Sequence, residues 1–236
     1  MADWNKTQRL RARLALEDKI IYKEERPYYL ASYQGRTIQL PIICRDSPIL
    51  GGVCLGEHRR EAFYVSPQSV ALKDLTTEVK KRAVAHGGVE RNHLLMGIFD
   101  TVTEHLPYDK TKTREVILKQ IKTKDDLISL GDFIREHAGV CRHQAVACAA
   151  LMELLGEDQE LKSIDAHLKG KPSVDRNRYN GQGHTWARYT SPTGLVVILD
   201  VANNFIGHLN SEETQKKIKK GTLWPYQRPA EVIFPF

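Results

Sequence analysis

Residues 140–155, with the sequence "VCRHQAVACAALMELL", place apolar side chains on nearly every side of an α-helix. A helix with so little polar surface is expected to lie at the centre of a fold, covered by protein all round. Gly156 follows directly and predicts the end of the helix. The 236 residues suffice for the surrounding layers in one large domain, or in one domain with an appended subdomain.

Cys141 lies at the first turn of this predicted helix, directly after a glycine and a valine. Inside an apolar helix a cysteine acts as a small hydrophobic residue, and Cys148, two turns later, fits that description. At the first turn, backbone N–H groups lack intrahelical partners and the helix dipole is positive, so a thiolate is stabilised. Cys141 is therefore a candidate nucleophile. His143 is too close in sequence to serve as its base, because it points to another side of the helix.

Two later segments, "HTWARYT" and "GLVVILDV", predict neighbouring antiparallel strands that carry a base and a carboxylate. If residues 191–193 form the turn, Thr190 pairs with Gly194, and His184 then lies directly opposite Asp200 on the same face. A turn one residue longer would offset the pair by one position and separate the two side chains. A cysteine nucleophile needs such a base, and a carboxylate or amide usually orients that base.

The order of cysteine, histidine and aspartate on a helix and two strands resembles the transglutaminase-like superfamily of papain-type cysteine enzymes. The matching segments are "GVCRHQA", "GHTWARY" and "VVILDVA", preceded by "LPYD" at residues 106–109. Thr185 and Val201 stand where alanine and proline are frequent in that superfamily. Members include peptidases, peptide:N-glycanase-like amidases, deamidases and cross-linking transglutaminases, so the fold alone does not determine the activity.

The resemblance implies an α+β fold with a papain-like core, in which the nucleophile begins a central helix packed on an antiparallel sheet. It also implies that Cys141 attacks an amide carbonyl, His184 transfers protons and Asp200 orients His184. We expect a peptidase or other amidohydrolase that passes a thioester acyl group to water, with a protein or peptide as substrate. A transglutaminase or deamidase acting on protein glutamine is the alternative. A non-catalytic protein- or nucleic-acid-binding module on the same fold would not need all three residues.

Two aromatic residues are candidates for contact with the substrate. Trp186 lies two positions from His184 on one strand face, so we expect it to wall the cleft. Tyr108, in the "LPYD" segment, is a candidate for the oxyanion hole beside the backbone N–H of Cys141. A residue of the loop before Gly139 is the other candidate for that role.

We expect the chain to have two parts. Residues 1–75 would form an N-terminal helix plus a β-rich portion that packs on the core, and residues 76–236 would form the transglutaminase-like catalytic core. Residues 4–23 predict an amphipathic helix, and "YYLASY", "RTIQLPIIC" and "EAFYVS" predict strands. The polar, glycine-containing residues 167–183 predict a surface loop. Three further helices are expected at residues 69–85, 89–106 and about 113–122.

The chain has 35 basic and 29 acidic side chains, a balance that permits nucleic acid as a partner without requiring it. No motif for nucleic-acid recognition accompanies the charge, so we do not expect such a partner. The densest basic run, "KKIKK" at residues 216–220, is typical of a solvated helix end. No segment offers the roughly 20 apolar residues of a membrane span. No secretory signal is evident at the start, so we expect a cytoplasmic protein, with leaderless export left open.

The sequence predicts neither a cofactor nor a metal ion. Cys44, Cys54 and His58 lack the close pair and the fourth ligand of a zinc site, so a metal-dependent enzyme is the weaker alternative. Four cysteines are too few for a disulfide scaffold and indicate free thiols in a reducing compartment. The sequence leaves the oligomeric state open.

Overall fold

The structure, a computed structural model, describes residues 19–24, 26–33, 36–44, 47–55, 61–121 and 127–228. Within these residues it contains seven helices and three sheets, so the expected α+β class is confirmed. The helices are α2 (Val70–Ala85), α3 (Arg91–His105), α4 (Lys110–Ile121), α5 (Leu130–Arg135), α6 (Cys141–Glu157), α7 (Gln159–Ser163) and α8 (Glu212–Lys219). The strands are β1 (Ile20–Lys23), β2 (Arg26–Tyr33), β3 (Arg36–Pro41), β4 (Val53–Cys54), β5 (Phe63–Tyr64), β6 (Ile128–Ser129), β7 (Lys171–Tyr179), β8 (Gln182–Thr190), β9 (Val196–Asp200) and β10 (Phe205–His208).

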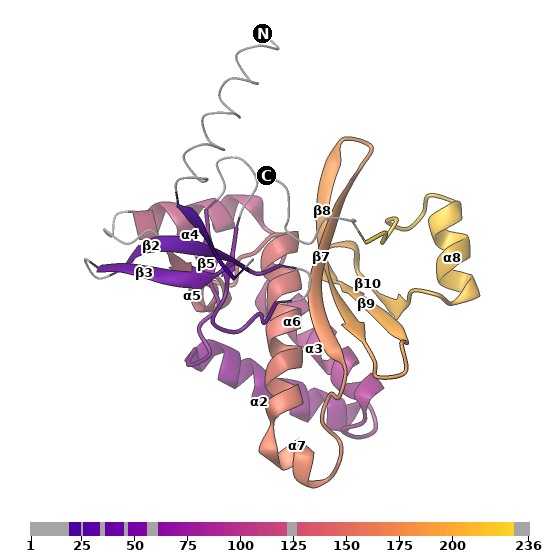
Figure 1. Ribbon diagram of the computed structural model, residues 1–236. Helices are drawn as coiled ribbons and strands as arrows, with labels where there is room; N and C mark the ends of the chain where they lie inside the picture. The colour runs from indigo at the N-terminus through magenta and orange to yellow at the C-terminus, as the bar shows by residue number, and fades with distance from the viewer. Residues whose placement is uncertain are drawn as a thin grey trace.

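Helix α6 occupies the middle of the molecule, as its apolar composition predicts (Figure 1). It packs against β7, β8 and β9 on one side and against α2 and α3 on another. The sequence predicted that the helix ends at Gly156, but it continues to Glu157. Gly156 serves close packing instead, since a Cβ atom there would lie 3.1 Å from the backbone oxygen of Leu168.

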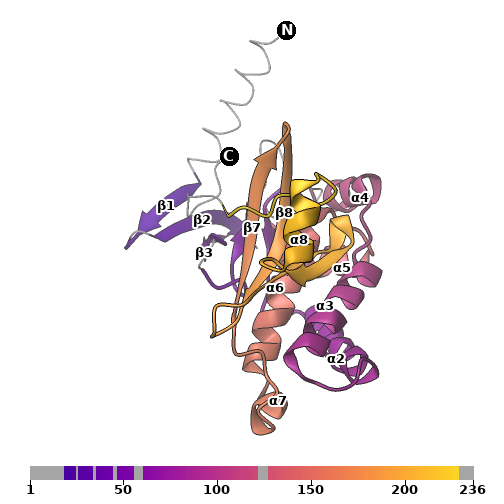
Figure 2. The ribbon, with the colours of Figure 1, turned by 90° about the vertical axis from the view of Figure 1, so that its right-hand side faces the viewer.

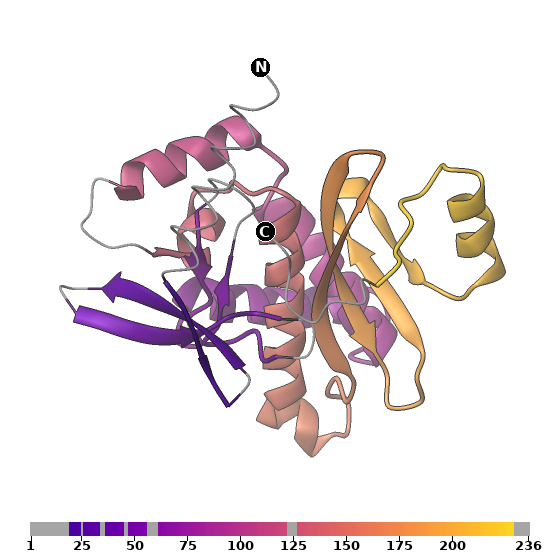
Figure 3. The same cartoon turned by 45° about the horizontal axis from the view of Figure 1, so that its top comes forward.

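The second layer of the core is an antiparallel sheet in the order β10-β9-β8-β7. Because side chains alternate along a strand, Ala187 and Tyr189 of β8 belong to the main core with α6. Trp186 points to the other face of the sheet and belongs to a separate apolar cluster there. Ile218 of α8 packs in the same cluster. Figures 1 and 3 show α8 on this outer side of the sheet, away from α6.

The stretch predicted as a surface loop, residues 167–183, forms β7 and the beginning of β8 instead. Asn180 and Gly181, both with positive φ, make a two-residue turn between the strands. This dipeptide is the preferred sequence for such a hairpin turn, because both positions need a left-handed backbone. The resulting hairpin projects beyond the other strands (Figure 2).

A small sheet in the order β1-β2-β3 lies on the opposite side of α6 from the four-stranded sheet (Figures 1 and 3). Its first strand corrects one prediction, because residues 20–23 were expected to end an amphipathic helix. They pair with β2 instead, with Ile20 and Ile21 opposite Tyr29 and Tyr28, as suits β-branched and aromatic side chains. The earlier part of that predicted helix, residues 4–18, lies outside the described residues.

The described residues between positions 43 and 65 link this small sheet to the main core. Strand β5 pairs in parallel with β6, which joins the N-terminal portion to a segment that directly precedes α5. The carboxylate of Glu153 on α6 accepts hydrogen bonds from the backbone N–H groups of Ile49 and Leu50, both at 2.8 Å. The division expected between residues 75 and 76 falls within α2, which Ser69 caps through a bond to the Leu72 N–H.

No helix in the described part of the chain is long and apolar enough to cross a lipid bilayer.

Candidate active site

Cys141 is the first residue of α6, and its side chain is nearly buried, with 9% of the residue exposed. Val140 precedes the helix in an extended conformation, and its backbone N–H donates to Nδ1 of His143 at 3.1 Å. This contact defines the start of the helix at Cys141. The sulfur therefore lies where the helix dipole favours a negative charge, as the sequence predicted.

His184 on β8 contacts both Cys141 and Asp200. Its Nε2 is 2.7 Å from Oδ2 of Asp200, and its side chain is hydrogen-bonded to that of Cys141. Burial lowers the pKa of His184, but the hydrogen bonds and charges of Asp200 and Cys141 outweigh burial and raise the pKa to about 9. The imidazole is therefore protonated at neutral pH, where it stabilises a thiolate on Cys141.

The strand register that brings His184 to Asp200 differs from the predicted one. Thr190 pairs with Val196 and not with Gly194, because the loop between β8 and β9 has five residues. Gly194 has a φ of +81° within this loop, a conformation that favours glycine. The shift amounts to two residues and so keeps both side chains on one face, as diagonal instead of direct neighbours.

The Asp200 carboxylate is almost fully buried, with 1% exposed, and four donors compensate its charge. Oδ2 lies 2.7 Å from Nε2 of His184 and accepts from Nδ2 of Asn203 and the hydroxyl of Tyr226, both at 2.8 Å. Oδ1 accepts the backbone N–H of Asn203 at 3.3 Å. Asn203 and Tyr226 were not predicted from the sequence, since neither belongs to a segment that resembles the superfamily.

Two tryptophans flank His184, and only one of them borders the cleft. Trp224 packs its ring edge-on against His184 at a centroid distance of 4.9 Å and lines the cleft. Trp186 stacks behind His184 at 6.2 Å and is completely buried. The prediction that Trp186 walls the cleft is therefore wrong, because its strand face is covered by Tyr226. Trp224 takes that place and was missed, since it follows a polar helix without any motif.

Cys141 and His184 lie in a cleft of about 650 Å³, a size typical of sites for small ligands or peptide segments. Tyr108 is 48% exposed and lines the same cleft as Cys141 and His184. This place is compatible with the substrate contact that the sequence predicted for it. The parallel bridge between Tyr108 and Gly139 holds this residue beside the segment that leads into Cys141. Tyr108 thus stays the side-chain candidate for an oxyanion hole with the Cys141 backbone N–H. The other lining residues are Glu61, Lys110, Thr113, Arg114, Ile117, Val140, Arg142, Gln182, Gly183, Ala202, Asn203 and Trp224.

A charged pair, Arg142 and Glu61, lies in the wall of the cleft that holds Cys141. Arg142 donates to both the backbone oxygen and the carboxylate of Glu61, and His143 lies 3.4 Å from the same carboxylate. Burial opposes the ionisation of Glu61, but His143 and Arg142 outweigh burial and lower the pKa of its carboxyl. His143 is fully buried between the rings of Phe63 and Phe133, so it is not placed to act on a substrate.

The other three cysteines are free, buried thiols. Burial raises the pKa of Cys44 and of Cys54 to about 11, and raises the pKa of Cys148 further. Cys44 and Cys54 therefore behave as structural thiols in the described part of the chain. His58, the third member of the metal site considered from the sequence, lies outside the described residues.

Iodoacetamide is expected to alkylate Cys141 at pH 6 at least about 100-fold faster than Cys44, Cys54 or Cys148. The reason is that His184 stabilises the Cys141 thiolate, whereas burial raises the pKa of the other three thiols. Peptide mapping by mass spectrometry after brief treatment measures each site. A His184→Ala variant is the control and should lose the advantage. Equal labelling of all four cysteines would contradict the assignment of Cys141 as nucleophile.

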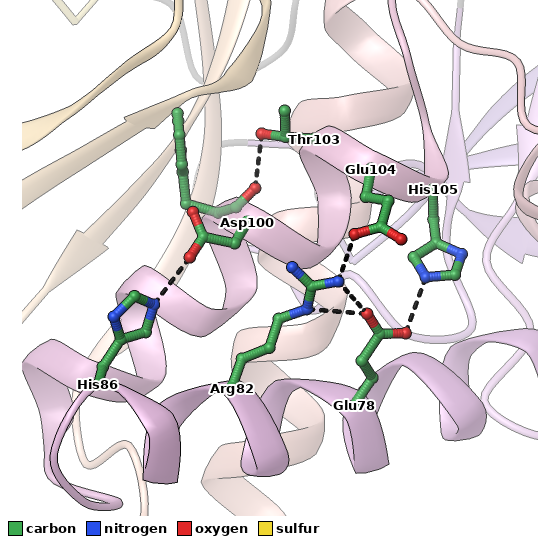
Figure 4. Close-up of polar contacts among 8 residues, drawn as sticks. Glu78, Arg82, His86, Asp100, Thr103, Glu104 and His105 are labelled. Carbon is green, nitrogen blue, oxygen red and sulfur yellow. Dashed lines mark hydrogen bonds and ion pairs between the residues drawn. The ribbon is translucent and has the colours of Figure 1, made fainter.

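Among the residues that the structure describes, Glu78, Glu104 and His105 form a group with the geometry of metal ligands. Figure 4 shows that Arg82 reaches both carboxylates and that His105 pairs with Glu78. Nε2 of His105 lies 2.7 Å from Oε2 of Glu78. The guanidinium already supplies the positive charge that a metal ion would bring. The next pair along the two helices, His86 with Asp100 at 2.7 Å, continues the same pattern. We therefore interpret the group as a row of hydrogen bonds and ion pairs that joins α2 to α3.

Comparison of the chain with models of protein families, with curated proteins and with solved structures finds no match. Its function is therefore inferred from the geometry around Cys141, His184 and Asp200.

Proposed function

We propose that this chain is a cysteine-dependent amide-bond enzyme with a papain-like core of the transglutaminase-like type, acting as a peptidase or other amidohydrolase. The observation that supports this most is the series of hydrogen bonds from Cys141 through His184 to Asp200 beside an open cleft. A thiol at a helix N-terminus, an imidazole and a buried carboxylate together meet the requirements of acyl transfer through a thioester. None of the four cysteines forms a disulfide bond, which suits a reducing compartment such as the cytoplasm.

In the first half of the reaction, the Cys141 thiolate attacks the carbonyl carbon of the amide, and the carbonyl oxygen becomes an oxyanion. The backbone N–H of Cys141 lies at the helix N-terminus, where it is suited to stabilise that oxyanion, with Tyr108 as the candidate side chain. His184 donates its proton to the leaving nitrogen, the C–N bond breaks, and the amine departs. A thioester on Cys141 and a neutral imidazole remain.

In the second half, neutral His184 removes a proton from water, and the resulting hydroxide attacks the thioester carbonyl. The C–S bond breaks, the acid is released, and the thiolate–imidazolium pair is restored. Asp200 holds one imidazole nitrogen throughout and stabilises the charged form of the ring. Because Tyr226, Trp186 and Trp224 surround the pair, little water competes for these hydrogen bonds.

The rate of amide hydrolysis is expected to fall as the pH rises through about 9, the pKa of His184. Above that pH the imidazole is neutral and cannot protonate the leaving nitrogen, so the raised pKa extends activity to the alkaline side. Asp200→Asn removes a partner that raises this pKa and should move the alkaline limb towards about 6.5, the ordinary histidine value. A pH profile of kcat/KM measures the limb, which belongs to the Cys141–His184 pair as a unit. An alkaline limb that stays unchanged in Asp200→Asn would contradict the role of Asp200.

The cleft wall formed by α4 predicts a preference for acidic substrates. Lys110 and Arg114 line it one helical turn apart, and within the described residues no ion pair engages either of them. Charge reversal at both positions should lower kcat/KM for a peptide with acidic residues near the scissile bond by roughly 10-fold, relative to a neutral peptide. Lys112→Glu, on the same helix but outside the cleft lining, is the matched control. A variant that loses equally on both peptides would show that the two cations do not select the substrate.

Product analysis tests the proposed function directly. A glutamine-containing peptide library is incubated with the chain, with and without an added primary amine, and analysed by mass spectrometry. Hydrolysed backbone is expected, and it must disappear in Cys141→Ala. Deamidated or amine-linked glutamine would instead assign the chain to the deamidase or transglutaminase alternative, since both use the same acyl-enzyme. No Cys141-dependent product from any peptide would favour the non-catalytic binding module.

A further inference from the structure

Residues 223–228, here called the C-terminal strap, follow α8 and lie on the face of the four-stranded sheet that points away from α6. Three of them, Leu223, Trp224 and Tyr226, pack in the apolar cluster formed there by Trp186 and Ile198. Tyr226 contacts Trp186 edge-on at 5.3 Å between ring centres. The strap thus covers the strand face that carries His184 and Asp200.

Strand β7 anchors the strap through alternate polar residues. Ser173, Asp175 and Asn177 occupy every second position, so they share one face of the strand. Arg228 donates to both Asp175 oxygens at 3.0 and 3.1 Å and to the Ser173 hydroxyl at 2.8 Å. Asn177 accepts the indole N–H of Trp224 at 2.7 Å and donates to the Pro225 carbonyl at 2.7 Å.

This anchoring explains a costly feature of β7. The Asp175 carboxylate is 1% exposed, and a buried charge of this kind is strongly destabilising unless it is paired. Arg228 supplies that pairing, with Arg188 at 3.8 Å as a second cation. The strap is therefore attached at a defined place, with little freedom to slide along the sheet.

Two strap residues reach the catalytic pair. Tyr226 donates its hydroxyl hydrogen to Oδ2 of Asp200, the same oxygen that pairs with His184. Burial and the charge of Asp200 raise the pKa of Tyr226 far above its usual value, so the phenol stays protonated and keeps donating. Trp224 packs against the ring of His184. The orientation of Asp200 is consequently set from the strap as well as from its own strand.

We propose that the C-terminal strap is a positioning element of the active site, in which Tyr226 fixes the Asp200 carboxylate and thereby the orientation of His184. The inference rests on the proposed function only for its effect on turnover. Its effect on the Cys141–His184 pair can be measured without any substrate.

The test compares Tyr226→Phe with Tyr189→Phe. The first change removes one hydroxyl at Asp200 and keeps the ring. The second removes the hydroxyl of a comparably buried tyrosine, which accepts the Gly170 N–H and belongs to the core on the α6 side. Tyr226→Phe should lower kcat by about 10- to 100-fold with KM unchanged, as the loss of a hydrogen bond to a charged group predicts. Tyr189→Phe should leave kcat within about twofold, since it touches no catalytic group.

The second readout is the pH profile of Cys141 alkylation by iodoacetamide. In Tyr226→Phe the alkaline step, which reports His184, should move to higher pH, because Asp200 loses a donor and offers His184 more negative charge. Arg228→Ala loosens the strap without touching Asp200 or His184 and should also lower kcat, whereas Arg228→Lys should restore part of it. Thermal unfolding of each variant checks the fold. If Tyr226→Phe does not fold, Arg228→Lys, which keeps a cation at the buried Asp175 carboxylate, decides the question by a kcat below that of the parent chain.

The outcomes separate the strap from the proposed function. If the alkylation profile shifts in Tyr226→Phe but the unaltered chain turns over no amide, the positioning role of the strap is supported and the proposed enzymatic function is contradicted. If the parent chain is active and Tyr226→Phe changes neither kcat nor the alkylation profile, the proposed function is supported and the positioning role of the strap is contradicted. Equal losses in Tyr226→Phe and Tyr189→Phe would also overturn it, since the hydroxyl would then act through stability alone.

Discussion

Replacement of Cys141 by alanine is expected to abolish turnover of an amide substrate and to leave the protein folded. The change removes one sulfur atom at the border of the cleft, where the structure can absorb it with a stability change of about 1 kcal/mol or less. The loss of the nucleophile should lower kcat by roughly 10⁴- to 10⁶-fold, because no other described side chain in the cleft is a thiol. Steady-state kinetics and urea unfolding of the same preparation separate the two effects.

Variants of the other two members of the proposed triad should follow a defined order of activity. His184→Ala is expected to be nearly as inactive as Cys141→Ala, and the double variant no worse, since the two groups act as a unit. Asp200→Asn should retain about 10- to 100-fold more activity than either, because nucleophile and base both remain. Asn203 and Tyr226 still hold the side chain at position 200 in that variant. Additive losses in the double variant would contradict a shared mechanism.

His143 provides the matched control for His184. It is the other histidine near Cys141, but it lies between two phenylalanine rings and caps the helix through Val140. His143→Asn keeps a side chain that can accept the Val140 N–H, so kcat per folded molecule should fall by less than about 10-fold. A His143→Asn variant as inactive as His184→Ala would show that His143 is the base.

The central helix and the parity of the triad strands were predictable for a physical reason. A helix that is apolar on all sides has one stable location, the interior, and its first residue then lies at a core–surface boundary. His184 and Asp200 stay on one sheet face in any register that differs by an even number of residues. The prediction that the two side chains share a face therefore holds although the loop is two residues longer than predicted. Gly194 lies in that loop with a left-handed backbone.

The strap and the strand that anchors it were not predictable in the same way. Periodicity identifies strands through apolar alternation, but the outward positions of β7 are polar because they bind the strap. Those partners lie about fifty residues away in the chain, beyond any local pattern. The dipeptide Asn180-Gly181 is typical of a hairpin turn and was the local evidence for this hairpin. The polar and charged residues around the dipeptide instead favoured the prediction of a surface loop. Tyr226 likewise became visible only through its bond to Asp200.

A chain that starts at Val70 is expected to lose cooperative unfolding and to aggregate. The deletion removes Ile43, Ile49, Phe63 and Val65, all of which are at most 2% exposed in the main core. At about 1.5–3 kcal/mol for each buried side chain, their loss amounts to about 6–12 kcal/mol, comparable with the whole stability of an ordinary domain. It would also expose the apolar surface of β6, which loses its partner β5.

The same deletion also changes the charges around Cys141. Arg142 and His143 lose Glu61, which leaves two buried basic groups beside Cys141, and the buried Glu153 carboxylate loses both of its backbone donors. Single variants of the full chain distinguish this from a general sensitivity to change. Phe63→Ala should cost about 3–5 kcal/mol in urea unfolding, whereas Tyr22→Ala, at a residue 64% exposed, should cost less than about 0.5 kcal/mol. A chain from Val70 that melts cooperatively and still hydrolyses a small amide would instead make the N-terminal portion a separable module, with substrate recognition as its remaining role.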